Sequence, residues 1–188
     1  MARDIKITAK PQEDPLITAD PDEGPGAWHP FEGPLHVIPE GRTEVYQAYG
    51  DPGVTYPKKG VVKVSLKWER ANLVMARNLP GYGKPVYVHR LVEPYLREAM
   101  RRAAIAAPGY VIHRLGCFAP RHQRHDPSRP LSTHTWALGP DINPDTNKPY
   151  TKGDMPAAFV AAWTSVGFEW GGDWVSYPDP MHMQLCRS

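Results

Sequence analysis

The clearest periodic pattern of apolar residues lies between residues 88 and 107. Val92, Leu96, Met100 and Ala103 recur there at intervals of three or four positions, while the arginines of the segment fall mostly on other faces. Apolar residues at this spacing form one stripe along an α-helix, which a globular protein turns toward its core. The pattern therefore predicts an amphipathic helix with a solvated arginine face.

A second helix is predicted over residues 154–168. Phe159 and Trp163 lie one helical turn apart, so their rings are expected on the same face. Asp154 is of the residue type that caps a helix N-terminus, and Gly167 is of the type that ends a helix. We expect the helix to begin and end near these two residues.

Three segments have the features of β-strands. Residues 60–68 alternate in polarity, and residues 109–118 form an apolar run that leads to an arginine-containing segment. The tail at residues 181–185 also alternates. In a strand, His182 and Gln184 would share one face while the apolar residues of the tail share the other. One face would look into a site and the other into the core.

The first 60 residues differ in composition from the rest. Residues 8–60 are rich in Pro, Gly and acidic residues, which do not sustain long helices. Residues 1–60 carry 6 Lys and Arg against 10 Asp and Glu, although the whole chain has a net charge of +2. We expect an acidic extension over residues 1–60, packed on or leading into one domain over residues 61–188. The basic excess of that domain suits an anionic polymer but is too small to indicate nucleic-acid binding.

The residues that indicate chemistry lie in two segments near the C-terminus. His134 and Asp141 are seven positions apart with Gly139 and Pro140 between them, and His182 follows in the tail. Gly and Pro favour a bend, so His134 and Asp141 can face one metal ion from its two sides. Two imidazoles and one carboxylate hold zinc with a fourth position open, as in catalytic rather than structural zinc sites. Other divalent ions also accept this set of ligands.

A further carboxylate, Asp179, lies three residues before His182. A carboxylate beside the metal can take a proton from the attacking water and pass it to the leaving amine. The residues therefore predict a zinc hydrolase. Strands that bear the ligands, with helices packed on one side, predict an α+β fold with a small antiparallel sheet.

The signatures of several other enzyme classes do not occur in the sequence. It has no His-Glu-x-x-His motif of a thermolysin-type protease and no Gly-x-Ser-x-Gly motif of a serine hydrolase. It also lacks a phosphate-binding Gly-rich loop that ends in Lys-Ser or Lys-Thr.

Residues 132–143 (STHTWALGPDIN) resemble the first zinc motif of the M15 peptidases, which is roughly Ser-x-His-x-x-Gly-x-Ala-x-Asp. Residues 167–185 resemble the second motif, in which Gly-Gly-Asp-Trp leads to an acidic residue, two spacers and His. The chain departs from the family where Ala137 and Gly139 exchange its two small residues and where Pro140 precedes the metal-binding Asp. We expect a shifted backbone there and an intact site.

The resemblance implies a role for each of these residues. It places the zinc ligands at His134, Asp141 and His182. It places the general base and acid at Asp179. It further implies an upstream arginine that stabilises the oxyanion, which would be Arg121, with Arg124 as the next candidate. Ser132 stands where the family has a substrate-facing serine.

The resemblance also implies a fold and a function. The fold would be of the M15 or hedgehog-like peptidase type, and Zn2+ would be the cofactor. The expected activity is hydrolysis of peptidoglycan stem peptides by an L-alanyl-D-glutamate endopeptidase of the phage endolysin type. The alternatives are a D-Ala-D-Ala carboxypeptidase and, from another class, a non-catalytic zinc-containing protein that binds the cell wall.

The remaining features concern location. No apolar stretch approaches the length of about 18 residues that a membrane span needs. The first residues lack the hydrophobic run of a signal peptide. We therefore expect a monomer made in the cytoplasm that reaches the wall after holin-type release or as a virion component. Cys117 and Cys186 permit a disulfide, but free and mostly buried thiols are expected.

Overall fold

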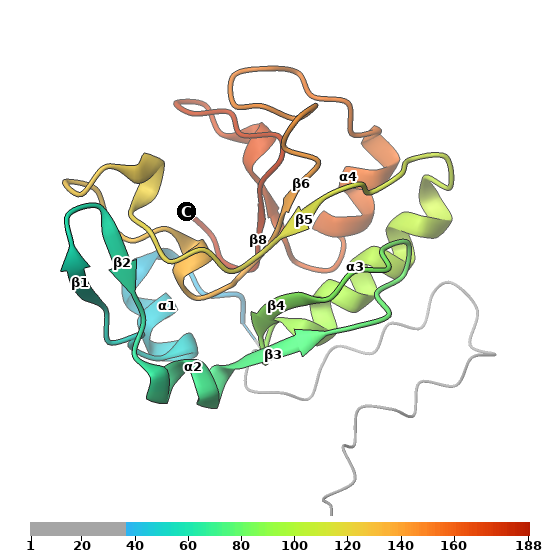
Figure 1. Cartoon of the computed structure of the whole chain (residues 1–188). Coiled ribbons are helices and arrows are strands. Elements are labelled where there is room, and N and C mark those ends of the chain that lie inside the picture. The colour runs from blue at the N-terminus through green and yellow to red at the C-terminus, as the bar shows by residue number, and fades with distance from the viewer. Residues whose placement is uncertain (1–36) are drawn as a thin grey trace, which may run out of the picture. The chain divides into compact units, whose positions relative to one another are not determined.

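The computed structural model describes residues 37–188 (Figure 1). Most of the predicted N-terminal extension, residues 1–36, lies outside the described residues, and the boundary expected at residue 60 stays a prediction. The elements in chain order begin with α1 (Gly41–Tyr49), β1 (Thr55–Lys58), β2 (Val61–Lys63), α2 (Leu66–Asn72), β3 (Leu73–Ala76) and β4 (Val86–His89). They continue with α3 (Glu93–Ala106), β5 (Leu115–Gly116), β6 (Asp141–Ile142), α4 (Ala157–Thr164), β7 (Glu169–Trp170) and β8 (Met183–Gln184).

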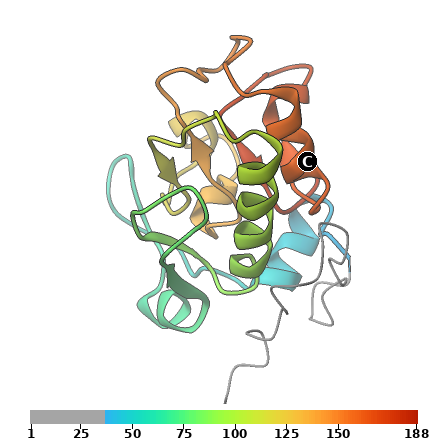
Figure 2. The ribbon, with the colours of Figure 1, turned by 90° about the vertical axis from the view of Figure 1, so that its right-hand side faces the viewer.

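The predicted amphipathic helix is α3, whose apolar stripe is buried as expected. Leu96 and Met100 are at most 1% exposed, and Val92 and Ala103 are buried with them. Arg101 and Arg102 pair with Glu98 at the helix surface. The helix packs against α4, as Figure 2 shows, and the Arg102 Nη1 donates to Ser165 Oγ across the two at 3.0 Å.

The second predicted helix is confirmed as α4, but its expected N-cap is wrong. Phe159 and Trp163 are buried, with ring centroids 6.1 Å apart, and Gly167 follows the helix with a φ of +112°. Pro156 stands at the N-cap position. The Asp154 carboxylate instead accepts hydrogen bonds from Tyr110 and Asn147, which draw it into a loop network and away from the helix start.

Two of the predicted strands are much shorter than the sequence pattern suggested. In residues 60–68 only β2 is extended, because Ser65 starts α2, which brings Trp68 onto α1 with its Nε1 3.0 Å from the Tyr49 carbonyl. In residues 109–118 only β5 pairs. The backbone N–H groups of His113 and Arg114 donate to the Asn143 side chain instead of a neighbouring strand.

A small antiparallel arrangement of four short strands lies at the centre of the described unit. β5 pairs with β6, and β7 pairs with β8. The two pairs are joined through a bridge between Asp141 and His182, with backbone hydrogen bonds from Ile142 to Met181 and from Met183 to Pro140. The order in space is therefore β5–β6–β8–β7, of which Figure 1 labels β5, β6 and β8. The expected mixture of helices and small antiparallel sheets is confirmed, and the two central strands join the predicted metal ligands.

Helix α1 is fixed onto this arrangement by contacts that span most of the chain. The Tyr49 hydroxyl donates to the Leu185 carbonyl at 2.6 Å, and Trp136 Nε1 donates to the Gly50 carbonyl at 2.8 Å. Tyr49 is 1% exposed and Trp136 is fully buried. Residues 41–50 are thus part of the wall around the C-terminal strands.

Two expectations from composition concern cysteines and membranes. Cys117 and Cys186 are both free and buried. None of the helices in residues 37–188 combines the length and the apolar character that crossing a bilayer requires.

Candidate metal centre and active site

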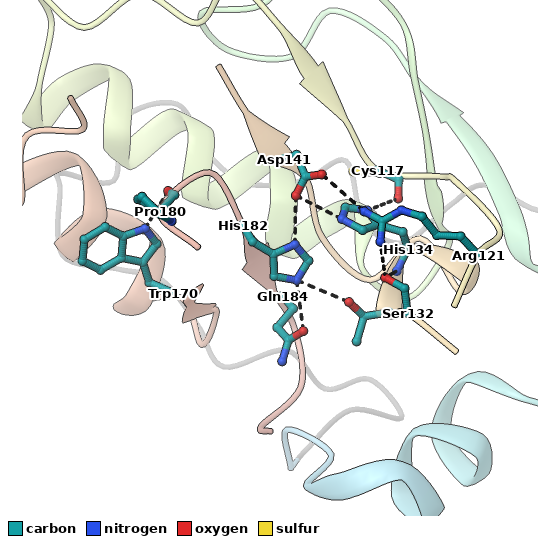
Figure 3. A network of polar contacts seen from close by, with 10 residues as sticks. Cys117, Arg121, Ser132, His134, Asp141, Trp170, Pro180, His182 and Gln184 are labelled. Atoms are coloured by element: carbon teal, nitrogen blue, oxygen red, sulfur yellow. Dashed lines mark hydrogen bonds and ion pairs between the residues drawn. The ribbon is translucent and has the colours of Figure 1, made fainter. Parts of the chain in front are cut away.

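His134 is held by a short 3₁₀ turn at residues Thr133–Thr135. Ser132 stands at the N-cap of this turn, and its hydroxyl accepts from the His134 backbone N–H at 3.4 Å. The His134 side chain is 2% exposed, and its Nε2 lies 3.0 Å from Asp141 Oδ1 (Figure 3). The turn therefore delivers the imidazole to the carboxylate at the start of β6.

The backbone between His134 and Asp141 bends, and β8 packs closely against the bend. Ala137 adopts a left-handed conformation with a φ of 54°. A Cβ at Gly139 would collide with the backbone of Met183, so only glycine fits at that position. The Pro140 carbonyl accepts from the Met183 N–H at 3.0 Å. The close approach of β8 thus accounts for glycine at position 139, and His134 and Asp141 still meet.

His182 completes the group from the opposite strand. Its Nδ1 lies 2.9 Å from Asp141 Oδ1, and its ring meets the His134 ring edge to face with centroids 4.8 Å apart. His182 and Gln184 lie on the same face, as the alternation predicts, with His182 Nε2 3.1 Å from Gln184 Oε1. The next apolar residues, Met183 and Leu185, are fully buried.

In their neutral forms, the N–H groups of both imidazole rings point away from Asp141. The Cys117 carbonyl, 2.8 Å from His134 Nδ1, can only accept, so that nitrogen carries the proton and Nε2 presents its lone pair. The Gln184 amide donates to the Cys186 carbonyl, which leaves its Oε1 to accept the Nε2–H of His182. Neutral His182 therefore presents the lone pair of Nδ1 to the carboxylate.

Three acceptor atoms thus converge, and the ligand atoms of His134, Asp141 and His182 all lie within 4.8 Å of one another. Lone pairs that face each other in a buried site repel unless a cation lies between them. Two imidazoles with outward N–H groups held by protein acceptors, together with one carboxylate, are a donor set for zinc with an open position. The residues therefore fit Zn2+, and other divalent ions share the preference.

The pKa values of the group agree with a site that attracts a cation. Burial opposes charge on Asp141, but when the adjacent His134 and His182 rings are protonated, their N–H groups and positive charge hold the pKa of its carboxyl well below the usual range. Burial also opposes the charged form of His182, yet the Asp141 carboxylate raises its pKa. At His134 burial prevails and the pKa is lowered. A carboxylate that stays ionised beside two imidazoles supplies the negative charge for a metal ion.

Asp179 lies beside the group without being part of it. Its backbone carbonyl accepts from the His182 N–H at 3.0 Å, and its N–H donates to Gly171 at 2.8 Å. The side-chain Oδ1 is buried and has no hydrogen-bond partner among residues 37–188. Burial raises the pKa of the carboxyl to about 6, against the lowering effect of the His182 and Arg121 charges. A nearby dication would favour the ionised form and lower this pKa again.

Arg121 and Ser132 contact each other beside the group of His134, Asp141 and His182. Arg121 Nη1 donates to Ser132 Oγ at 3.0 Å, and Arg121 Nη2 lies 3.7 Å from Asp141 Oδ2 (Figure 3). Arg124, the alternative, has its guanidinium 3.7 Å from the centre of the Tyr177 ring. Arg121 is thus the arginine that contacts a proposed metal ligand, while its role in catalysis stays a prediction.

One cavity of about 610 Å³ is lined by most of these side chains, although Asp141 is not among its lining residues. Besides Ser132, His134, Asp179, His182 and both arginines, its lining includes Trp174 and Gln184, as well as residues to which the sequence assigned no role, notably Arg42, Trp136, Tyr177 and Arg187. Alternation placed Gln184 on the face of His182 but did not indicate its hydrogen bond. No local pattern could have indicated Arg42, which is 89 positions from its hydrogen-bond partner Leu131.

Comparison with known proteins gives one match. The family model described as D-alanyl-D-alanine carboxypeptidase, one of the M15 peptidase models, matches residues 125–185. The match supports an M15 peptidase. It covers both segments that bear His134, Asp141, Asp179 and His182. No curated protein and no solved structure matches the chain, so the likeness of its fold to M15 or hedgehog-like peptidases stays a prediction.

Proposed function

We propose that the protein is a zinc-dependent peptidase that hydrolyses peptidoglycan stem peptides. One observation carries the proposal: His134, His182, Asp179 and Arg121 line the same cavity, and Asp141 contacts both histidines at 3.0 and 2.9 Å. The Asp179 carboxylate also has an oxygen without a hydrogen-bond partner among residues 37–188. A general base and a cationic donor beside a metal group are what metal-assisted amide hydrolysis requires. The match to a peptidase family model supports the same reaction.

The ligands of the proposed zinc are His134 Nε2, Asp141 Oδ1 and His182 Nδ1. When bound there, zinc would polarise the scissile carbonyl and make a water molecule nucleophilic at neutral pH. Asp179 takes the proton of the attacking water on its free Oδ1 and then delivers it to the departing amine. Arg121, oriented by Ser132, donates to the oxygen that becomes negative.

Among the bonds of a stem peptide, we place cleavage first at the L-alanyl-D-glutamate bond. An endopeptidase must hold chain on both sides of the scissile bond. The cavity suits this because its lining extends from the loop at Trp174 and Tyr177 to α1 at Arg42. Its volume of about 610 Å³ lies in the range that holds a ligand of several residues. A role as an endolysin that reaches the wall after release from the cytoplasm is part of this proposal.

The description of the matching family model favours a second candidate, a D-Ala-D-Ala carboxypeptidase. Such an enzyme would use a cation of the cavity to bind the free C-terminal carboxylate. The two candidates share the metal group and Asp179, and they differ only in the product that they release.

Digestion of purified peptidoglycan by the zinc-loaded protein, followed by mass spectrometry of the products, tests the proposal. New N-terminal D-Glu is expected, whereas free D-Ala would establish the carboxypeptidase. Walls with lysine and with diaminopimelate in the stem should both be tried.

Asp179→Ala should keep zinc and lose activity by about a hundredfold to ten-thousandfold, the usual contribution of a general base. Cleavage near the wild-type rate would show that another group is the base. Absence of any product from the zinc-bound wild type would instead favour a non-catalytic wall-binding protein.

A further inference from the structure

The part of the cavity next to α1 contains a cation that the catalytic scheme does not use. Arg42 is half-buried, and its Nη2 donates to the Leu131 carbonyl at 2.9 Å. Its guanidinium carbon lies 6.0 Å from the centre of the Trp136 ring. A guanidinium has five N–H groups, so most of its donors are left for a ligand.

No carboxylate of the described chain neutralises Arg42. It forms no ion pair within residues 37–188, whereas Arg97, Arg101 and Arg102 all pair with glutamates on α3. A half-buried charge without a counter-ion is costly unless a ligand supplies one. The position of Arg42 therefore favours binding of a negatively charged group in the cavity.

The electrostatics around Cys186 locate two cations at this end of the cavity. Burial raises the pKa of the Cys186 thiol to about 12 with help from the charge of Glu169, while Arg42 and Arg187 act in the opposite direction. Both arginines line the cavity. Glu169 is hydrogen-bonded by Trp174 and Ser188 rather than by either arginine.

Arg42 lies close in space to the proposed metal group, because residues 131–134 contact both. Leu131, Ser132 and His134 belong to one segment, and they contact Arg42, Arg121 and the metal group respectively. Three residues span at most about 11 Å at about 3.8 Å between neighbouring Cα atoms. An extended substrate covers a similar length per residue, so Arg42 can reach a group a few residues from the scissile bond. The ribbon of α1 lies below Ser132 and Gln184 in Figure 3.

We propose that Arg42, backed by the Trp136 ring, is a specificity-determining residue that binds a free carboxylate of the substrate close to the cleaved bond. The inference rests on the proposed peptidase function and deepens it. Stem peptides carry two carboxylates of this kind, the α-carboxylate of γ-linked D-Glu and the C-terminal carboxylate. A planar guanidinium binds either one through two parallel hydrogen bonds.

The test compares three N-acetylated pentapeptides of sequence L-Ala-γ-D-Glu-L-Lys-D-Ala-D-Ala. One has both carboxylates free, one is a carboxamide at the D-Glu α-carboxyl, and one is a carboxamide at the C-terminus. We expect the zinc-loaded wild type to prefer one free carboxylate by about ten- to a hundredfold in kcat/KM, the range of a hydrogen bond to a charged group. Arg42→Gln should remove most of that preference.

Arg114→Gln is the matched control, because Arg114 is an exposed arginine that faces Asp145 at 3.7 Å and does not line the cavity. It should keep the wild-type preference. Arg42→Lys should retain part of it, since the ammonium keeps the charge but loses the planar fork. This variant also serves if Arg42→Gln fails to fold by circular dichroism.

Three results would overturn the inference: a wild type that treats acid and amide peptides alike, an Arg42→Gln variant with the wild-type ratio, and an equal loss on all three peptides. The last would mean that Arg42 only supports the segment at Leu131. If the wild type cleaves none of the peptides, the peptidase proposal fails. The subsite is then tested by calorimetry, in which the affinity ratio of acid to amide peptides is compared between the wild type and Arg42→Gln.

Discussion

Two regions of this molecule bury histidine equally and use it differently. His134 and His182 meet a shared carboxylate at the join of β6 and β8, and both are at most 4% exposed. His89, at the end of β4, is fully buried between Tyr49 and Trp68, with ring centroids 5.0 and 5.8 Å away. Burial alone therefore does not distinguish a ligand from a core residue. A ligand histidine differs from a core histidine in that the lone pair of its ring nitrogen faces another acceptor.

The protonation of the two regions shows the same contrast. His89 Nδ1 accepts from the Leu91 N–H, and the ring forms no ion pair with a carboxylate of residues 37–188. Burial, aided by the charge of Arg90, lowers the pKa of His89 to about 4. At His182 the Asp141 carboxylate reverses the effect of burial and raises the pKa. One region excludes positive charge and the other attracts it.

The largest expected effect comes from breaking the metal group. His134→Ala and His182→Ala should each lose both zinc and peptidoglycan hydrolysis, because two protein ligands do not hold a catalytic zinc as three do. His89→Gln should retain both. Zinc content after dialysis and release of peptides from purified walls measure the effect. If His89→Gln lost zinc while His134→Ala kept it, the contrast between the regions would be wrong.

A smaller effect is expected from the residue that orients His182. Gln184→Leu removes the acceptor of the Nε2–H and should weaken zinc binding by about ten- to a hundredfold, as loss of such an outer partner does. Gln184→Glu still accepts this hydrogen bond and should restore most of the affinity. Competition with a chelator of known affinity measures both. Equal affinities for Gln184→Leu and the wild type would show that the hydrogen bond does not orient the ligand.

Two features of the molecule were predictable from the sequence: the group of His134, Asp141 and His182, and the buried stripe of α3. The metal group was predictable because each ligand lies in a short segment whose local features are visible: a bend at Gly139 and Pro140, and an alternating tail around His182. The stripe of α3 was predictable for the same reason, since the spacing of apolar residues within one helix indicates which face is buried. In both cases the informative residues are close together in the chain.

What the sequence did not predict depends on contacts between distant segments. The run at residues 109–118 has strand-like composition, but the Asn143 side chain takes backbone N–H groups that a strand would offer to a neighbour. Residues 65–68 turn into α2 because Trp68 finds a partner on α1. Arg42 lines the cavity next to Leu131 and Trp136, both of which are far from it in the sequence. No periodicity within any of these segments encodes the partner.

A separate expected effect, on folding and not on zinc binding, is the pH dependence that His89 gives to stability. Its folded pKa of about 4 lies below the unfolded value near 6.5, so the unfolded chain binds more protons between these pH values. The stabilisation is therefore complete above about pH 6.5 and is lost as pH falls toward 4, by about 3 kcal/mol in total.

Urea unfolding of the wild type and His89→Gln at pH 7, 5.5 and 4.5 measures this contribution as the difference between the two series. His113→Gln, at an exposed histidine, is the control and should follow the wild type. Parallel curves for wild type and His89→Gln would show that His89 does not resist protonation.

The central claim is that His134, Asp141 and His182 are the ligands of one zinc ion. A crystal structure of the zinc-loaded protein, with anomalous data at the zinc edge, tests it most directly. The account predicts one peak about 2.0–2.2 Å from His134 Nε2, Asp141 Oδ1 and His182 Nδ1. A zinc ion bound elsewhere, or no peak at this group in protein that contains stoichiometric zinc, would contradict it.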